Sequence, residues 1–209
     1  YKAEVIKEML PIHFNIKLKE EKISVTTTNK MPIPLNNSLE VFLYDRKIYL
    51  PNEEQIKFLK VIYKPLMDKG QVILANNEEN LVKILRILSN ITEDISLGEG
   101  VKRLVTSLIK PEFYFTKVND DIYCKVDINY SIGKITLLKD INKLSFIRDN
   151  IYEEKIVMEM EKLKFIRDDS KFKFIGEDED IYNLLSVRFK ELLKEGKVYL
   201  TKDFKDIRL

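Results

Sequence analysis

Apolar and polar residues alternate with a period of two in several short stretches of the chain. Residues 12–18 alternate in this way, and residues 22–28 continue the pattern after a polar turn at Glu20 and Glu21. A period of two places successive side chains on opposite faces of a strand, so this region predicts a β-hairpin. A second strand pair is predicted at 39–44 and 47–50, after a loop that contains two prolines.

Other stretches repeat their apolar residues every three to four positions, which predicts amphipathic helices. The first helix is expected to begin at a capping box of Asn52 and Gln55, to kink or end at Pro65, and to exit at Gly70. Further helices are expected after an N-cap at Asn77, over 151–163 with Asp149 as its cap, and from an N-cap at Asp178 to Gly196. The segment 101–108 fits either a helix or a strand.

The clearest hairpin is predicted in the second half of the chain. Residues 112–118 and 122–130 alternate strongly and are joined by a polar turn at 119–121. Further strands are predicted at 71–75, 134–138, within 165–175, at 198–200 and at 204–209. Because strands cluster in hairpins and do not alternate regularly with helices, the sequence predicts an α+β fold. We expect mainly antiparallel sheets, about four amphipathic helices, and two closely packed subdomains at 1–95 and 96–209.

Composition and charge exclude several functional classes. The chain has 209 residues, of which 44% are hydrophobic and 33% charged, so it is expected to bury a core. Lys and Arg number 36 against 34 Asp and Glu, and a net charge of +2 gives no strong field for nucleic acid. Any DNA contact must therefore come from a local patch. No apolar run approaches the roughly 18 residues of a membrane span, no leader opens the chain, and we expect a cytoplasmic protein without a membrane partner.

The residues that usually carry chemistry do not form a recognisable set. Gly133 and Lys134 are followed by an isoleucine where a phosphate-binding loop needs Ser or Thr. The only histidine, His13, is expected at the surface, and the only cysteine, Cys124, is expected to be a small buried hydrophobic residue. The carboxylate groups at 120–121 and 177–180 lie at a turn and a helix start, where acidic residues have structural roles. We therefore expect no catalytic residue, no cofactor and no metal in this segment.

Basic residues gather loosely in several places. Arg148 precedes the predicted cap Asp149; it either reaches outward or bridges the subdomains, and a structural role is favoured over phosphate binding. Phe113, Tyr114, Phe115 and Tyr123 could stack on bases if exposed, but alternation places most of them in the core. Glu residues three positions before Lys162, Lys164 and Lys194 predict ion pairs on helices. The candidates for nucleic-acid contact are Lys102, Arg103, Arg148, Lys162, Lys164 and Arg167.

Three stretches in a fixed order carry a resemblance to a known family. They are Pro111-Glu112-Phe113-Tyr114-Phe115 leading to 122–130, Phe146-Ile147-Arg148-Asp149 leading to 155–165, and Ile181-Tyr182 leading to Gly196-Lys197-Val198-Tyr199 and Phe204. Together they resemble the helicase-associated domain that precedes the motor of bacterial Swi/Snf-family ATPases. The family's glycine directly after the tyrosine is displaced here to Gly133.

The resemblance implies that the enzymatic activity belongs to another part of the parent polypeptide. Members of such a family are DNA-dependent ATPases, so the motor is expected after residue 209 of the same polypeptide. The parent chain would be an ATP-dependent DNA helicase or translocase, and this segment a non-catalytic accessory domain that docks on or regulates its motor. An autonomous DNA-binding module is the alternative. A stand-alone metal-dependent hydrolase is a third hypothesis, which only the carboxylate groups support.

Overall fold

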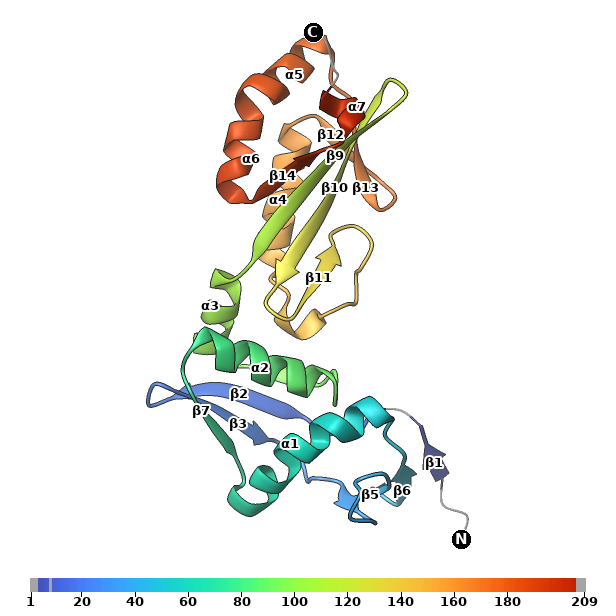
Figure 1. Ribbon diagram of the computed structural model, residues 1–209, viewed down its shortest axis with the longest axis vertical. Coiled ribbons are helices and arrows are strands. Elements are labelled where there is room, and N and C mark those ends of the chain that lie inside the picture. The colour runs from blue at the N-terminus through green and yellow to red at the C-terminus, as the bar shows by residue number, and fades with distance from the viewer. Residues whose placement is uncertain (1–3, 8, 206–209) are drawn as a thin grey trace. The chain divides into compact units, whose positions relative to one another are not determined.

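The computed structural model describes residues 4–7 and 9–205, and for residue 205 the backbone alone. Its contacts divide the chain into two compact units, 1–104 (unit 1) and 105–209 (unit 2), each with its own sheet and helices (Figure 1). The predicted α+β class is confirmed. Strand pairing is mainly antiparallel, although β1 with β6, β2 with β8, and β14 with β9 pair in parallel.

Unit 1 contains two four-stranded sheets. The larger has the order β7-β3-β2-β8 and is built on the predicted hairpin. Its strands are β2 (Phe14–Lys19), β3 (Lys22–Thr27), β7 (Val72–Ala75) and β8 (Ile95–Leu97). The smaller has the order β1-β6-β5-β4, with strands β1 (Glu4–Ile6), β4 (Ile33–Pro34), β5 (Phe42–Tyr44) and β6 (Lys47–Tyr49). Phe14 and Ile16 of β2 and Ile23 and Val25 of β3 are fully buried and form the core with two helices.

The helices of unit 1 confirm their predicted caps and correct one prediction. Asn52 and Gln55 form the capping box of α1 (Glu53–Lys69), and Asn77 caps α2 (Glu78–Ser89). Pro65 does not end the helix, because α1 continues to Lys69. Proline removes only one backbone hydrogen bond, and the apolar face that includes Leu66 stays buried on both sides of it. Gly70 ends the helix at a φ of 68°, as a left-handed cap requires.

Unit 2 is built on a six-stranded sheet with the order β12-β13-β10-β9-β14. The sixth strand, β11, pairs with the C-terminal half of β10. The predicted hairpin of β9 (Lys110–Val118) and β10 (Asp121–Tyr130) is its centre. The other strands are β11 (Gly133–Thr136), β12 (Phe165–Asp168), β13 (Lys171–Phe174) and β14 (Lys197–Leu200). The ambiguous segment before β9 is a helix, α3 (Glu99–Ser107), and the boundary between the units falls inside it.

Helices cover one face of the unit 2 sheet (Figure 1). They are α4 (Asn150–Lys162), α5 (Asp178–Asn183), a π-helical turn η2 (Leu184–Arg188), α6 (Phe189–Glu195) and the short α7 (Lys202–Lys205), and a 3-10 turn η1 (Ser145–Ile147) precedes α4. Their apolar faces pack on a core of phenylalanines, which are Phe113, Phe115, Phe165, Phe172, Phe174, Phe189 and Phe204. The face that carries them is called the covered face below.

Two sequence predictions for this helical layer need correction. The N-cap of α5 is Glu177 and not Asp178, whose backbone is already helical. Phe204 lies in α7 and not in a strand, because its buried ring packs against Phe115 and Phe189. The rest of that predicted strand, 206–209, lies outside the described residues.

Gly196 follows α6, as predicted, but it is extended and does not form a left-handed cap. Glycine is required there for another reason. A Cβ atom would meet the carbonyl oxygen of Pro111 at 2.0 Å, so only glycine lets β14 approach β9 this closely. Within the described part of the chain, no helix combines the length and the apolar character that crossing a membrane requires.

Candidate functional site

The two faces of the unit 2 sheet differ because side chains alternate along β9 and β10. Phe113 and Phe115 point to the covered face, and Tyr114 between them points to the opposite one. On β10, Tyr123 and Lys125 share that opposite face, while Cys124 between them is buried. We call the opposite face the open face. Its charged and tyrosine residues include Glu112, Tyr114, Asp121, Tyr123, Lys125, Asp127, Lys134, Asp168, Lys171, Lys173, Lys197 and Tyr199.

Tyrosines and lysines interleave on the open face. The parallel pairing of β14 with β9 places Tyr199 beside Tyr114, and their rings stack with centroids 4.8 Å apart and planes within 10°. The Nζ of Lys125 lies 4.7 Å from the centroid of Tyr114. On the next strand, the Nζ of Lys171 lies 3.7 Å from the centroid of Tyr123. These ring contacts hold the ammonium groups near the sheet surface through cation–π attraction.

Three carboxylates on the open face, those of Glu112, Asp121 and Asp127, are paired with lysines. Glu112 accepts hydrogen bonds from Lys134 Nζ at 2.5 Å and from the hydroxyl of Tyr114 at 2.6 Å. These donors stabilise the charged carboxylate and lower the pKa of Glu112 to about 2, against burial, which acts in the opposite direction. The buried Asp127 accepts from Lys125 at 2.9 Å and from a threonine hydroxyl.

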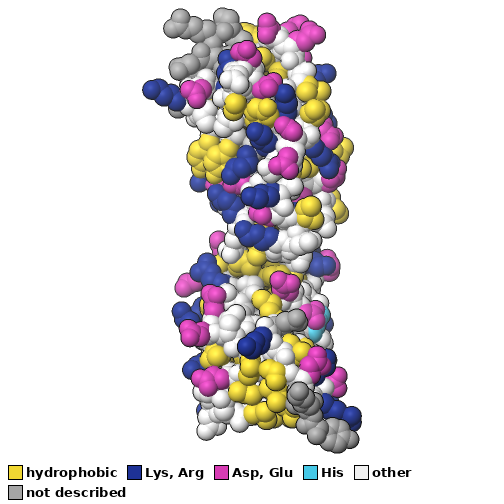
Figure 2. All heavy atoms as spheres, turned by 90° about the vertical axis from the view of Figure 1, so that its right-hand side faces the viewer, with side chains coloured by type: hydrophobic (Ala, Val, Ile, Leu, Met, Phe, Trp, Pro, Cys, Tyr) yellow, Lys and Arg dark blue, Asp and Glu magenta, His cyan; other side chains and the backbone are white. Residues whose placement is uncertain are grey.

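Some lysines of the open face are left without a carboxylate. Lys173 pairs with Asp121 at 3.0 Å, but neither Lys171 nor Lys197 has an ion-pair partner among the described residues. Figure 2 shows Lys and Arg side chains spread over unit 2, in the upper part of the view, with acidic and hydrophobic side chains between them. Tyrosines carry the hydrophobic colour in that figure. The open face therefore combines free cations with aromatic rings.

Arg148, the most prominent sequence candidate, lies inside unit 2. Its side chain is 8% exposed and forms a bidentate ion pair with Glu153, which lies in the first turn of α4. The same guanidinium donates to the backbone carbonyls of Asp140 and Ile141. Tyr130 donates its hydroxyl to Glu153 and accepts the backbone N–H of the cap residue Asp149. Burial, followed by the Glu153 carboxylate, raises the pKa of Tyr130.

This network contradicts both positions expected for Arg148, which neither reaches outward nor bridges the two units, and it supports the structural role that the sequence favoured. The guanidinium does not reach outward, because its donors are satisfied by Glu153 and the 140–141 carbonyls. Its role in the described structure is to tie the segment before α4 to the start of that helix. The predicted cap at Asp149 is confirmed, since its carboxylate accepts the N–H of Tyr152 at 2.9 Å.

The other basic candidates lie apart from the open face. Lys162 pairs with Glu159 as predicted, and Arg167 lies within ion-pair distance of Glu154 and Glu161 on α4. The predicted pairs of Glu161 with Lys164 and of Glu191 with Lys194 do not form, because Arg167 and Arg188 take those carboxylates. Lys102 pairs with Glu99 on α3, and Arg103 is exposed on the same helix. Nucleic-acid contact by these residues stays a prediction.

His13 takes part in a polar chain in unit 1. Its Nδ1 lies 2.6 Å from an Asp94 carboxylate oxygen, and its Nε2 lies 2.9 Å from the Ser96 hydroxyl. The order Asp, His, Ser is that of hydrolase triads, but a triad also needs a substrate cleft and an oxyanion hole. Ser96 lies in the middle of β8 and lines neither cavity of unit 1 described below. The hydrogen bonds instead connect β8 to the start of β2.

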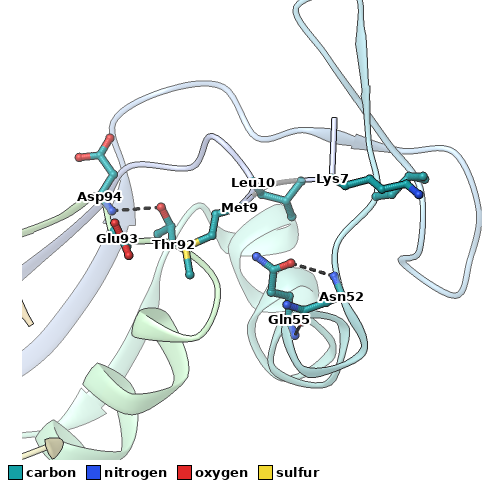
Figure 3. A pocket seen from close by; sticks show the side chains of 9 residues that line it. Lys7, Met9, Leu10, Asn52, Gln55, Thr92, Glu93 and Asp94 are labelled. Atoms are coloured by element: carbon teal, nitrogen blue, oxygen red, sulfur yellow. Dashed lines mark hydrogen bonds between the residues drawn. The ribbon is translucent and has the colours of Figure 1, made fainter. Parts of the chain in front are cut away.

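Two of the cavities among the described residues lie on unit 1. The first, of about 810 Å³, is surrounded by the segment before β2, the start of α1 and the loop before β8. Figure 3 shows that its polar groups bond to one another, Asn52 with Gln55 and Thr92 with Asp94. The second is a groove of about 970 Å³ on α1 and α2. Its lining is Lys57, Phe58, Val61, Glu78, Glu79, Val82, Lys83, Arg86 and Ile87.

The whole chain, residues 1–209, matches the family described as bacterial SNF2 helicase associated. It belongs to that family. The resemblance inferred from the three ordered stretches is thereby confirmed. No curated protein and no solved structure matches the chain.

The side chains of this SNF2 helicase-associated chain that could carry chemistry contribute to its fold instead. Cys124 is fully buried, which raises the pKa of its thiol, so the prediction of a small buried hydrophobic residue is confirmed. The 177–180 carboxylates begin α5, as predicted. Within 4–7 and 9–205, no three His, Cys, Asp or Glu side chains come together as a metal would require.

Sequence analysis of this family member missed the open face as a unit. Alternation in β9 and β10 could have placed Tyr114, Tyr123 and Lys125 on one face. The contributions of Tyr199 and Lys171 come from β14 and β13, whose pairing depends on contacts far apart in the chain. No local pattern in the sequence signals those pairings.

Proposed function

We propose that this chain is a non-catalytic accessory module of a bacterial Swi/Snf-type helicase, which docks on the ATP-dependent DNA translocase motor of the same polypeptide and regulates it. The observation that carries the proposal is the match of all 209 residues to a helicase-associated family. The position of the reactive side chains is consistent with it, because Cys124, the 177–180 carboxylates and the His13 chain all have structural partners.

The groove on α1 and α2 is the surface that we assign to the motor. Val61 in its lining is 55% exposed, and the groove combines apolar side chains with charges of both signs. An apolar centre with a charged rim is the usual anatomy of a protein interface. A regulatory module must contact its motor, and this groove is an exposed surface suited to that contact.

Steady-state ATPase measurements on the parent enzyme test the proposal. Deletion of residues 1–209 should change DNA-stimulated turnover, and Val61→Glu should change it in the same direction by placing a charge in the groove. Ile73→Glu is the matched control, because Ile73 is 50% exposed on unit 1 and lies outside the groove. Unchanged turnover after the deletion contradicts the proposed function. Equal effects of the two point variants contradict the assigned surface.

DNA binding by the module itself is a second candidate function. The observation that favours it is the open face of unit 2, where lysines without carboxylate partners lie beside partly exposed tyrosine rings. This candidate does not compete with docking, since the groove and the open face belong to different units.

A further inference from the structure

We propose that the open face of unit 2 binds single-stranded nucleic acid, with a base stacked on Tyr199 and with phosphates on Lys171 and Lys125. The inference deepens the second candidate function and rests on it, by naming the substrate class and the residues. It does not depend on docking of the motor.

The first argument is the position of the tyrosine stack. Tyr199 is 41% exposed, and one side of its ring is stacked on Tyr114. β14 is the edge strand of the sheet, so no neighbouring strand among the described residues lies against the outer side of Tyr199. A base added there would extend an existing stack of two rings. Every base offers a flat aromatic face, so such a site tolerates any sequence.

The second argument is that the lysines are already held in place. A free lysine loses conformational entropy when it binds a phosphate. Lys125 and Lys171 lie over the rings of Tyr114 and Tyr123, so part of that loss has occurred before binding. The register that pairs Tyr123 with Lys173 and Cys124 with Phe172 also brings Lys125 next to Lys171. Two like charges on neighbouring strands favour an anion between them.

The third argument concerns the carboxylates of the same face. Glu112 and Asp127 are buried and hydrogen-bonded to lysine, and Asp121 pairs with Lys173, so these three present little uncompensated charge to a phosphate. Lys171 and Lys197 lack an ion-pair partner in the part of the chain that the structure describes, although Asp168 lies opposite Lys171 in the pairing of β12 with β13. Lys125 gives one of its three N–H donors to Asp127 and keeps the others, so a nucleic-acid backbone would find donors on this face without breaking an ion pair.

The geometry points to a single strand and not to a duplex. In a duplex the faces of the bases are stacked on one another and are not available to a protein ring, whereas an unpaired strand exposes them. Tyr199 would have no stacking partner on duplex DNA, and only the lysines would contribute. The use of both the rings and the cations requires unpaired bases.

Fluorescence anisotropy of the 209-residue chain with a labelled oligothymidylate tests the proposal, with a duplex of equal length in parallel. The single strand should bind more tightly at low salt. Tyr199→Leu should weaken binding roughly tenfold through loss of the base stack, while Tyr199→Phe should bind like the wild type. Lys171→Ala should weaken binding and reduce the slope of log K against log salt by about 0.7.

Matched controls come from the helical side of unit 2. Tyr182 is 60% exposed on α5 and Lys190 is exposed on α6, so Tyr182→Leu and Lys190→Ala should leave both affinity and salt slope unchanged. Circular dichroism checks that each variant is folded. If Tyr199→Leu is not folded, the result for Lys171→Ala decides the outcome. The inference is overturned by absence of single-strand binding at low salt, by tighter binding to the duplex, or by equal effects of the test and control variants. Motor regulation is measured separately, so either proposal can fail alone.

Discussion

The covered and open faces of the unit 2 sheet are made by alternate residues of the same strands, and they use aromatic rings in opposite ways. On the covered face, Phe115 is fully buried among Phe165, Phe189 and Phe204. On the open face, the rings are tyrosines that remain partly exposed and contact lysines. A phenylalanine gains free energy only by leaving water, whereas a tyrosine hydroxyl keeps a polar partner at the surface.

The comparison shows that the tyrosine hydroxyl, which phenylalanine lacks, distinguishes the exposed open face, which a ligand can reach, from the buried covered face, which stabilises the fold. Tyr114 lies between two buried phenylalanines in sequence, yet it stacks on Tyr199 and donates to Glu112. Stability should therefore reside mainly in the covered face, and the open face should tolerate substitution. The four predictions that follow test this division, from the largest expected effect to the smallest.

Phe115→Ala should lower the free energy of unfolding of unit 2 by about 4 kcal/mol, because it removes a ring that packs against three others and leaves a cavity. Native-state hydrogen exchange of the β9 and β10 amides measures the loss within unit 2. An effect no larger than that of Tyr114→Ala would contradict the division between the faces.

Arg148→Met should destabilise unit 2 by about 3 kcal/mol, because it leaves the Glu153 carboxylate buried without its cation. Adding Glu153→Leu should recover much of the loss, since the unpaired charge is then removed as well. Urea unfolding of the single and double variants measures both effects. A double variant that is no more stable than Arg148→Met would show that the pair is needed for more than charge balance.

Tyr199→Ala should cost only about 1 kcal/mol in stability, which is the usual contribution of a stacked aromatic pair at a partly exposed site. Thermal unfolding of this variant beside Tyr199→Phe isolates the ring from the hydroxyl. A loss as large as that of Phe115→Ala would mean that the open face is part of the folding core.

Glu112→Gln should have the smallest effect, below about 1 kcal/mol, because its partner Lys134 is 43% exposed and solvent screens the pair. The pKa of Glu112 is about 2 in the folded chain against an ordinary value of 4.5. The pair therefore contributes fully above pH 4.5, and its contribution is lost as the pH falls toward 2. Urea unfolding at pH 7 and pH 2 should show a difference from the wild type only at pH 7. A difference that persists at pH 2 would contradict this assignment.

Local signals in the sequence predicted local structure well. The hairpin of β9 and β10 follows from alternation and a polar turn, and the caps at Asn52, Asn77 and Asp149 follow from side chains that bond to backbone within three residues. Errors arose where burial overrides a local preference. Helix α1 continues through Pro65, and Phe204 joins a helix because its ring fills the phenylalanine core.

The candidate site was less accessible to prediction. Alternation was expected to bury most of the aromatic residues at 113–115 and 123, and the structure leaves Tyr114 and Tyr123 partly exposed. The guanidinium of Arg148 is held in an internal network, and the contact of Lys171 with Tyr123 was not predicted, because it joins strands distant in the chain.

The order of amino acids therefore determined the elements, the alternation between faces, and the family to which the chain belongs, because each depends on short-range spacing or on ordered motifs. Which residues share a surface was decided only by folding. The approach of β14 to β9 at Gly196 brings Tyr199 against Tyr114, and the pairing of β13 with β10 brings Lys171 over Tyr123. Such contacts join positions many residues apart, and they form only when burial of the phenylalanine core compensates the entropy of closing the intervening chain.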